Sequence, residues 1–138
     1  MANVAEIKIL DEVVVDAGDA TDVEAPFEFS DIQRAWLADV AAKYGKIVLR
    51  VKFSSKTGSP VWEIRTVSLS YDGTNWAIAQ DLAPIDGGSD GEMSPVEMDL
   101  AMFGANPLKV RLDADVTTLG AGDKITIEAW LVIVCPND

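Results

Sequence analysis

The chain has 138 residues, of which 23 are acidic and 11 basic, so its formal net charge at pH 7 is −12. This excess of negative charge repels phosphate backbones and anionic lipids, which argues against nucleic acid or a membrane surface as a partner. The sequence has no histidine and a single cysteine, Cys135, and this excludes a Ser-His-Asp triad, a histidine-ligated zinc and an internal disulfide.

The length of the chain suits one domain, so residues 1–138 are expected to form a single β-sandwich domain. The first residues have neither the basic start nor the apolar run of a signal peptide, and no later run has the length of a membrane span. We therefore expect synthesis in the cytoplasm.

The amino-terminal part predicts a strand, because apolar side chains recur from residue 6 to residue 15. Asp11 and Glu12 interrupt the run, which indicates a bend or a bulge. Residues 1–15 are therefore either an arm or the first strand. Residues 26–29 alternate apolar with polar and predict a second, short strand.

Ser30 marks the start of a helix, because Gln33 follows it at the spacing of a capping box. Gly45 suits the end of that helix. Apolar side chains recur every four residues in between and are interpreted as one packed stripe: Ile32, Trp36, Val40 and Tyr44. The sequence thus predicts one α-helix near residues 31–44.

From residue 46 the apolar period changes to two, as in a strand with one buried face. We expect this strand to form an antiparallel hairpin with residues 61–70, because turn-forming residues occupy positions 54–60. Asp72 and Gly73 predict a tight turn, and residues 76–79 predict the next strand.

Residues 81–95 form the longest irregular segment and have the Gly, Asp and Pro content of a surface loop. Residues 96–103, 108–116 and 124–135 predict three more strands. About eight strands with regular turn signals are typical of a β-sandwich or a jelly roll. The expected fold class is all-β, a jelly-roll-like sandwich with one helix.

Residues 86–97 contain the most specific local pattern. They resemble an EF-hand calcium loop, with Asp86 at the first ligand position, Asp90 at the fifth and Glu97 at the twelfth. Gly88 stands where a ligand is needed and no flanking helix is expected, so a solvated acidic turn is the competing interpretation. The sequence predicts no cofactor beyond this Ca²⁺ candidate.

Two further patterns keep other functions open. Asp113 and Asp115 share one face of a strand, although glycosidase-type catalysis needs carboxylates on facing walls of a cleft. Burial competes with sugar stacking as the interpretation of the four tryptophans: Trp36, Trp62, Trp76 and Trp130. The sequence contains no phosphate-binding loop or Cys/His metal cluster, so we expect that the protein is not an enzyme.

The heptapeptide Ser70-Tyr71-Asp72-Gly73-Thr74-Asn75-Trp76 and the succession of short strands resemble small β-sandwich structural proteins of tailed bacteriophages, in particular head decoration (cement) proteins. The resemblance implies a domain that assembles, often as trimers, on the outer face of a capsid and reinforces it. The implied partners are further copies of the chain and the major capsid protein, and the implied location is the capsid surface of a virion. The 49% hydrophobic content agrees with a face buried against a partner.

The predicted function is therefore that of a virion structural protein that oligomerises and binds a capsid. The alternative is a carbohydrate-binding or receptor-binding accessory module, which needs an exposed pair of aromatic rings. We expect partner contacts in the amino-terminal arm and the helix, because terminal strands add readily to a neighbour's sheet edge. The candidate contact residues are Ile7, Ile9, Val13, Trp36 and Val40.

Overall fold

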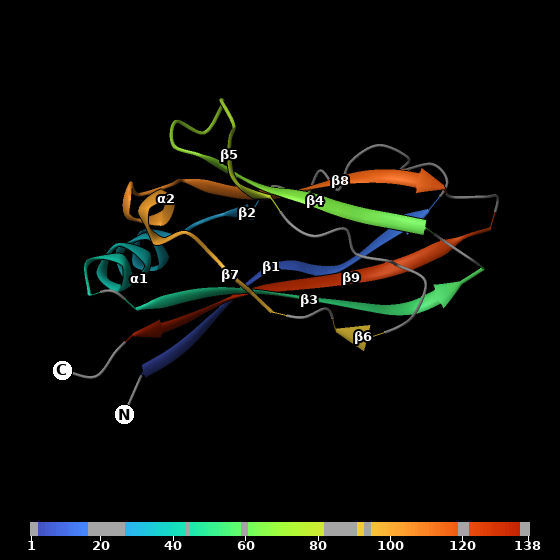
Figure 1. Ribbon diagram of the computed structural model, residues 1–138, viewed down its shortest axis with the longest axis horizontal. Coiled ribbons are helices and arrows are strands. Elements are labelled where there is room, and N and C mark those ends of the chain that lie inside the picture. The colour runs from blue at the N-terminus through green and yellow to red at the C-terminus, as the bar shows by residue number, and fades with distance from the viewer. Residues whose placement is uncertain are drawn as a thin grey trace.

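The computed structural model describes residues 3–16, 27–43, 45–58, 61–81, 91–92, 95–118 and 122–135. They form two antiparallel sheets packed face to face, with two helices at one end of the sandwich (Figure 1). The first strand begins and the last strand ends at this same end.

The strands are divided between two sheets, here called sheet A and sheet B. Sheet A contains β1 (Asn3–Asp16), β9 (Lys124–Cys135), β3 (Lys46–Thr57) and, beside β3, the two-residue strands β6 (Gly91–Glu92) and β7 (Val96–Glu97). Sheet B contains β2 (Phe27–Glu28), β8 (Lys109–Thr118), β4 (Val61–Ser70) and β5 (Ala77–Asp81), in that order. Helix α1 (Asp31–Ala42) connects β2 with β3, and helix α2 (Leu100–Gly104) precedes β8.

The strand pairing is that of a jelly roll. β4 pairs with β5, β3 with β6 and β7, β2 with β8, and β1 with β9, so the pairs nest outward from the β4–β5 hairpin. Successive strands β1 to β4 alternate between sheet A and sheet B, as when one long antiparallel hairpin is rolled into two layers. The predicted all-β, jelly-roll-like sandwich is confirmed.

The core lies between the sheets and is built by the alternation of each strand. β3 turns its apolar face inward, as its period of two predicts: Ile47, Leu49, Val51 and Phe53 are all buried. Sheet B closes the core with buried side chains from β4 and β8: Val67, Leu69, Val110 and Leu112. Burial of a side chain of this size contributes about 1.5–3 kcal/mol, so the contact between the two layers is the main source of stability.

The predicted hairpin between residues 46–53 and 61–70 is wrong, because β3 and β4 lie in different sheets. Packed sheets are about 10 Å apart, and each residue spans up to about 3.5 Å. The few residues between Thr57 and Val61 therefore suffice to cross from one layer to the other. The prediction that Asp72 and Gly73 form a turn is confirmed, since this turn joins β4 to its neighbour β5.

The predicted strand over residues 96–103 ends at Glu97, and α2 begins at Leu100. Asp99 caps this helix, because its carboxylate accepts a hydrogen bond from the Ala101 N–H at 3.0 Å. In β1 the predicted irregularity near Asp11 is confirmed, since the pairing with β9 shifts register between Lys8 and Leu10 and again after Leu10.

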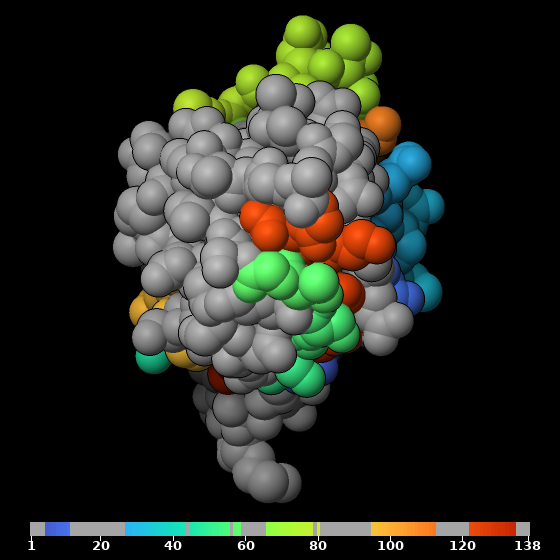
Figure 2. Space-filling view, turned by 90° about the vertical axis from the view of Figure 1, so that its right-hand side faces the viewer, coloured from blue at the N-terminus to red at the C-terminus, as the bar shows by residue number. Residues whose placement is uncertain are grey.

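At the end of the sandwich opposite the helices, the last residues of β3 lie against the first residues of β9 (green and orange-red in Figure 2). Gly58 has a φ of +79° there, and a Cβ at this position would overlap the Asp123 carboxylate. Glycine is the residue that tolerates both the backbone conformation and the close approach.

Candidate interaction surfaces

The capping box predicted at the start of α1 is present. The Gln33 N–H donates to Ser30 Oγ at 3.2 Å, and the Ser30 N–H donates to Gln33 Oε1 at 2.9 Å. The helix ends at Ala42, two residues before the predicted end. The Gly45 N–H donates to the Val40 carbonyl at 2.9 Å, which is the outer hydrogen bond of a Schellman-type helix end.

The apolar stripe predicted for α1 is wrong at Ile32 and Trp36. These side chains are 64% and 44% exposed, whereas Leu37 and Val40 are fully buried. Because an α-helix has about 3.6 residues per turn, positions four residues apart differ by about 40° around the axis, so Ile32 lies about 80° from Val40 and about 140° from Leu37. Ile32 and Trp36 together are called the α1 ridge below. Tyr44, the fourth predicted member, lies outside the described residues.

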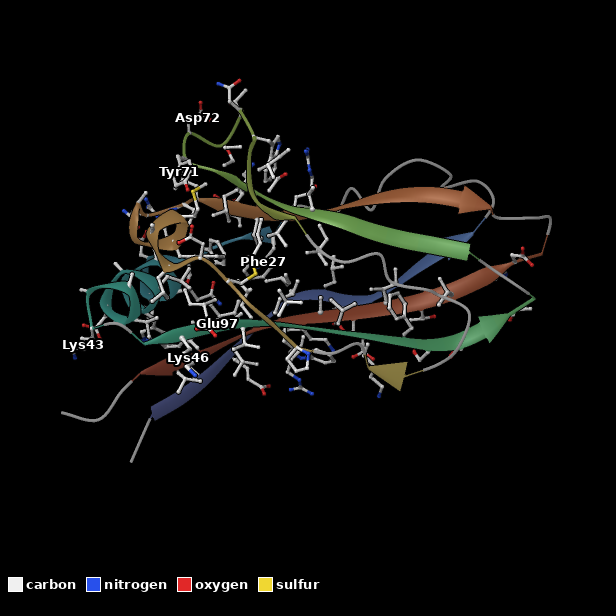
Figure 3. The ribbon with its side chains drawn as sticks, in the orientation of Figure 1. Phe27, Lys43, Lys46, Tyr71, Asp72 and Glu97 are labelled. Atoms are coloured by element: carbon white, nitrogen blue, oxygen red, sulfur yellow. The ribbon has the colours of Figure 1, made fainter. Side chains whose placement is uncertain are left out.

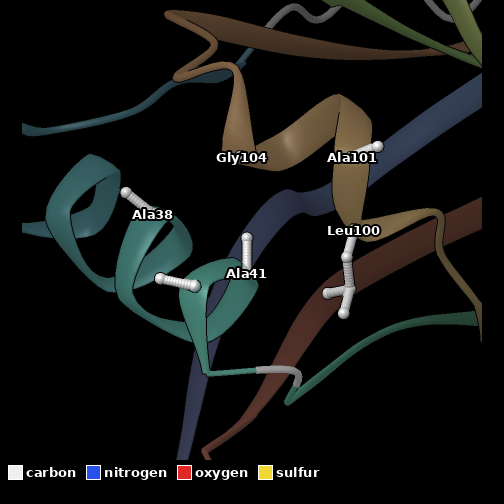
Figure 4. A pocket seen from close by; sticks show the side chains of 6 residues that line it. Ala38, Ala41, Leu100, Ala101 and Gly104 are labelled. Carbon is white, nitrogen blue, oxygen red and sulfur yellow. The ribbon is translucent and has the colours of Figure 1, made fainter.

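Helices α1 and α2 pack against each other, and an apolar pocket of about 410 Å³ opens beside their contact (Figure 4). Gly104 permits the contact, because a Cβ at this position would lie 3.2 Å from the Ala41 Cβ. The lining has no charged side chain: Ala38, Ala41, Ala42, Leu100, Ala101 and Gly104. It offers a partner apolar surface and no chemical group for catalysis.

The β4–β5 turn is attached to the helical end by Tyr71. The Tyr71 O–H donates to the Met102 carbonyl of α2 at 2.7 Å, and Figure 3 shows the ring beside this helix. Burial, together with the charge of Asp99, raises the pKa of Tyr71. The hydroxyl therefore stays protonated and keeps its role as a donor.

Asp72 organises the turn itself, at the tip of the hairpin in Figure 3. Its Oδ1 accepts hydrogen bonds from the Asn75 N–H at 2.7 Å, the Thr74 N–H at 2.8 Å and the Ser70 hydroxyl at 3.3 Å. These donors, with the Asn75 N–H first, hold the pKa of Asp72 well below its usual range. Gly73 follows with a φ of +86°, so the heptapeptide is built as a rigid turn.

The outer face of sheet A has Trp130 of β9 at its centre. Lys8 of β1 and Arg50 of β3 stand directly opposite Trp130 on its two neighbouring strands. The Lys8 Nζ lies 5.4 Å and the Arg50 Cζ 5.2 Å from the ring centroid. Cations at these distances are attracted to the ring, and they compete with a sugar for the surface of the ring.

Trp76 is covered in a similar way on sheet B, where the Arg111 Cζ lies 4.4 Å from its ring centroid. The side chain of Trp62 lies outside the described part of the chain. Among the described tryptophans, Trp36 alone has an exposed fraction above one third without a cation over its ring. The described rings therefore do not form the exposed pair that a carbohydrate-binding module needs.

Three of the residues predicted to contact a partner, Ile7, Ile9 and Val40, have their side chains in the core and not on the surface of the folded chain. Their apolar character serves the interior of the sandwich. The side chain of Val13 lies outside the described part. Of the five candidates, Trp36 is the one that the structure places on the surface.

Of the three predicted Ca²⁺ ligands, the structure describes Glu97 alone. Glu97 is exposed on β7, whereas Asp86 and Asp90 lie outside the described residues. Within the described part of the chain, no group of three or more Cys, Asp or Glu side chains has the geometry of a metal site. The side chains of Asp113 and Asp115 also lie outside it, so the proposed carboxylate pair stays a prediction.

Sequence reasoning missed two surface features. Ile78 of β5 is 64% exposed, and the predicted strand over residues 76–79 did not single it out. The row formed by Lys8, Trp130 and Arg50 was also missed, because the sequence of a single strand does not reveal which residues of its neighbours stand opposite.

In the described residues, no helix is long and apolar enough to cross a membrane.

Comparison with known proteins adds a likeness of fold. No protein-family model and no curated protein matches the chain. The structure is similar to a chain of the infectious bursal disease virus VP2 subviral particle, with a TM-score of 0.51 and 13% identity over 97% of this chain and 33% of that chain. A chain of the T13 particle of the same virus gives a TM-score of 0.47 and 14% identity over 97% of this chain and 31% of that chain. The chain thus spans about a third of the length of these neighbours, and the likeness concerns the fold.

Proposed function

We propose that this chain is a structural component of a virus particle, a jelly-roll domain that associates with copies of itself and binds the outer face of a capsid as a decoration (cement) protein. The observation that carries the proposal is the jelly-roll strand order, together with a likeness to a chain of a viral subviral particle that extends over 97% of this chain. Jelly rolls are a recurrent architecture of viral capsid domains.

The helical end supports a role in assembly. The α1 ridge places a half-exposed Trp36 beside the 64% exposed Ile32, and a separate apolar pocket opens on another face of α1, at its contact with α2. Interfaces are enriched in aromatic residues that act as anchors in a desolvated centre. We infer that the α1 ridge contacts the major capsid protein.

A role without catalysis fits the same observations. The pocket between the helices is lined by alanine, leucine and glycine, and the perturbed carboxylate of Asp72 is held in an exposed turn by its own backbone neighbours.

Self-association as a trimer, the state implied by the resemblance to decoration proteins, is part of the proposal.

The test uses capsids of the virus that encodes the chain, prepared from a strain in which the gene is deleted. The purified chain should co-sediment with these capsids, saturate at a fixed number of copies and raise the temperature at which the capsids disrupt. Failure of the folded chain to bind such capsids at any concentration would overturn the proposal.

A matched pair of variants locates the contact. Ile32→Ser removes an apolar side chain from the α1 ridge, and Ile78→Ser removes one of equal exposure, 64%, from β5. We expect Ile32→Ser to weaken capsid binding about tenfold, and Ile78→Ser to bind as the unmodified chain does. Equal effects of the two variants would contradict the assignment to the α1 ridge.

A further inference from the structure

We infer that β1 is a self-association edge, at which β1 of a second copy pairs antiparallel about Ile7 and joins the two A sheets into one. The inference deepens the proposed function and rests on its self-association, to which it adds a two-fold contact between copies that is separate from the three-fold contacts of a trimer. It starts from the place of β1, a strand of 14 residues, at the edge of sheet A, where it pairs with β9 on one side with two register shifts.

Among the described strands, the other sheet edges are short. β2, β6 and β7 have two residues each and β5 has five. A long edge strand presents a row of backbone N–H and C=O groups, which is the template that another strand recognises in β-augmentation. The edge of β1 is therefore the long edge of sheet A in the described part of the chain, while in sheet B the two-residue β2 leaves residues 111–118 of β8 without a described neighbour on that side.

The inward side chains of β1 are not available to the partner, because Ile7 is 1% and Ile9 5% exposed. Glu6 and Lys8 point to the opposite, outer face and are exposed. A second copy would therefore meet the backbone edge of β1 and these two charged side chains.

The charges select the register. Residues directly opposite in an antiparallel pair place their side chains on the same face. Pairing centred on Ile7 sets Glu6 against the partner subunit's Lys8, and Lys8 against the partner subunit's Glu6. Pairing centred on Glu6 or on Lys8 sets two like charges against each other at the axis. Pairing centred on Ala5 sets Glu6 against the partner subunit's Val4.

Contacts within each copy already engage both charges on the side of β9. Lys8 Nζ lies 2.8 Å from Glu128 of β9 and 2.9 Å from Asp11, and Glu6 lies 3.3 Å from Arg50 of β3. The pairs between copies form when these exposed side chains turn towards the free edge, and the internal ion pairs that they give up are worth little at the surface. Because each copy has a net charge of −12, the two Glu–Lys pairs offset a general repulsion, and the contact should respond to salt.

The experiment is sedimentation velocity over a range of protein concentrations, with two charge-reversal variants. In Glu6→Lys every cross-strand pair becomes Lys–Lys, and in Lys8→Glu every pair becomes Glu–Glu. Each variant alone should dimerise about tenfold more weakly or worse. An equimolar mixture should form heterodimers, because all pairs between the two variants are again opposite in sign.

The matched controls are Glu97→Lys and Lys46→Glu, which make the same changes in net charge at exposed positions along β3 and β7, away from β1. They should dimerise as the unmodified chain does, and circular dichroism should show that all four variants are folded. Recovery in the mixture also separates the edge contact from a loss of internal contacts, because mixing restores no pair within a copy.

A chain that stays monomeric at millimolar concentration would overturn the inference. So would a dimer or trimer whose stability is unaffected by Glu6→Lys and Lys8→Glu, and so would variants that weaken association without recovery in the mixture. Capsid binding by the chain in any of these cases would leave the proposed function intact, so the two failures are distinguishable.

Discussion

The two sides of helix α1 carry the same kinds of side chain and serve opposite purposes. Leu37 and Val40 have no exposed surface, whereas Ile32 and Trp36 are 64% and 44% exposed. The jelly roll thus takes its packing from one side of the helix and leaves apolar surface on the other. The difference teaches that hydrophobicity alone does not tell a core residue from a contact residue on this helix.

Replacement of Leu37 by alanine should have the largest effect on stability. A fully buried leucine leaves a cavity when it is truncated, and we expect a loss of about 2–5 kcal/mol in the free energy of unfolding. Urea unfolding followed by tryptophan fluorescence measures it. Trp36→Ala on the exposed side should change the same quantity by about 0.5 kcal/mol or less, and equal losses would refute the comparison.

Removal of the helix cap should lower the free energy of unfolding by an intermediate amount, because the cap stabilises α1 as a whole. Ser30→Ala loses the hydroxyl that accepts from the Gln33 N–H, and we expect a cost of about 0.5–2 kcal/mol. Ser30→Asp should retain most of the stability, because a carboxylate caps equally well. A Ser30→Asp variant as unstable as Ser30→Ala would show that the hydroxyl matters for another reason.

Acid should weaken the β4–β5 turn that adjoins the helical end. The pKa of Asp72 is lower in the folded chain than in the unfolded chain, so the ionised carboxylate stabilises the fold above the unfolded pKa of about 3.9. This contribution is lost as the pH falls from there towards the folded pKa. We expect the stability difference between the unmodified chain and Asp72→Asn to be largest near neutrality and to shrink in acid; a difference that is constant with pH would contradict this role.

The smallest effect on stability is expected at the α1 ridge itself. Ile32→Ser should leave the free energy of unfolding within about 0.5 kcal/mol of the unmodified chain, although it is expected to weaken capsid binding. A large loss of stability on this substitution would mean that Ile32 belongs to the core.

The sequence predicts the strands well where alternation is strict. In β3 every second residue from Ile47 to Phe53 is buried, because a period of two repeats without drift. The α1 stripe failed since a spacing of four drifts around a helix of about 3.6 residues per turn. The layer change between β3 and β4 was also missed, because the same turn residues suit a hairpin and a crossing.

The surfaces were harder to foresee than the strands. Trp36 lies on the surface and its partner contact stays a prediction, whereas the side chains of Ile7, Ile9 and Val40 are in the core. The row in which Lys8 and Arg50 flank Trp130 exists because three strands that are distant in sequence pair side by side. Such a juxtaposition follows from the jelly-roll order, which local patterns do not reveal.

The most direct test of the proposed role is a cryo-electron microscopy reconstruction of particles of the virus that encodes the chain under this proposal, compared with particles of the gene-deleted strain. We expect a two-layer sandwich in many symmetry-related copies on the outer surface, with the α1 ridge turned towards the capsid, and its absence after deletion. Particles that carry no such density, or density that survives deletion of the gene, would contradict the role in the virion.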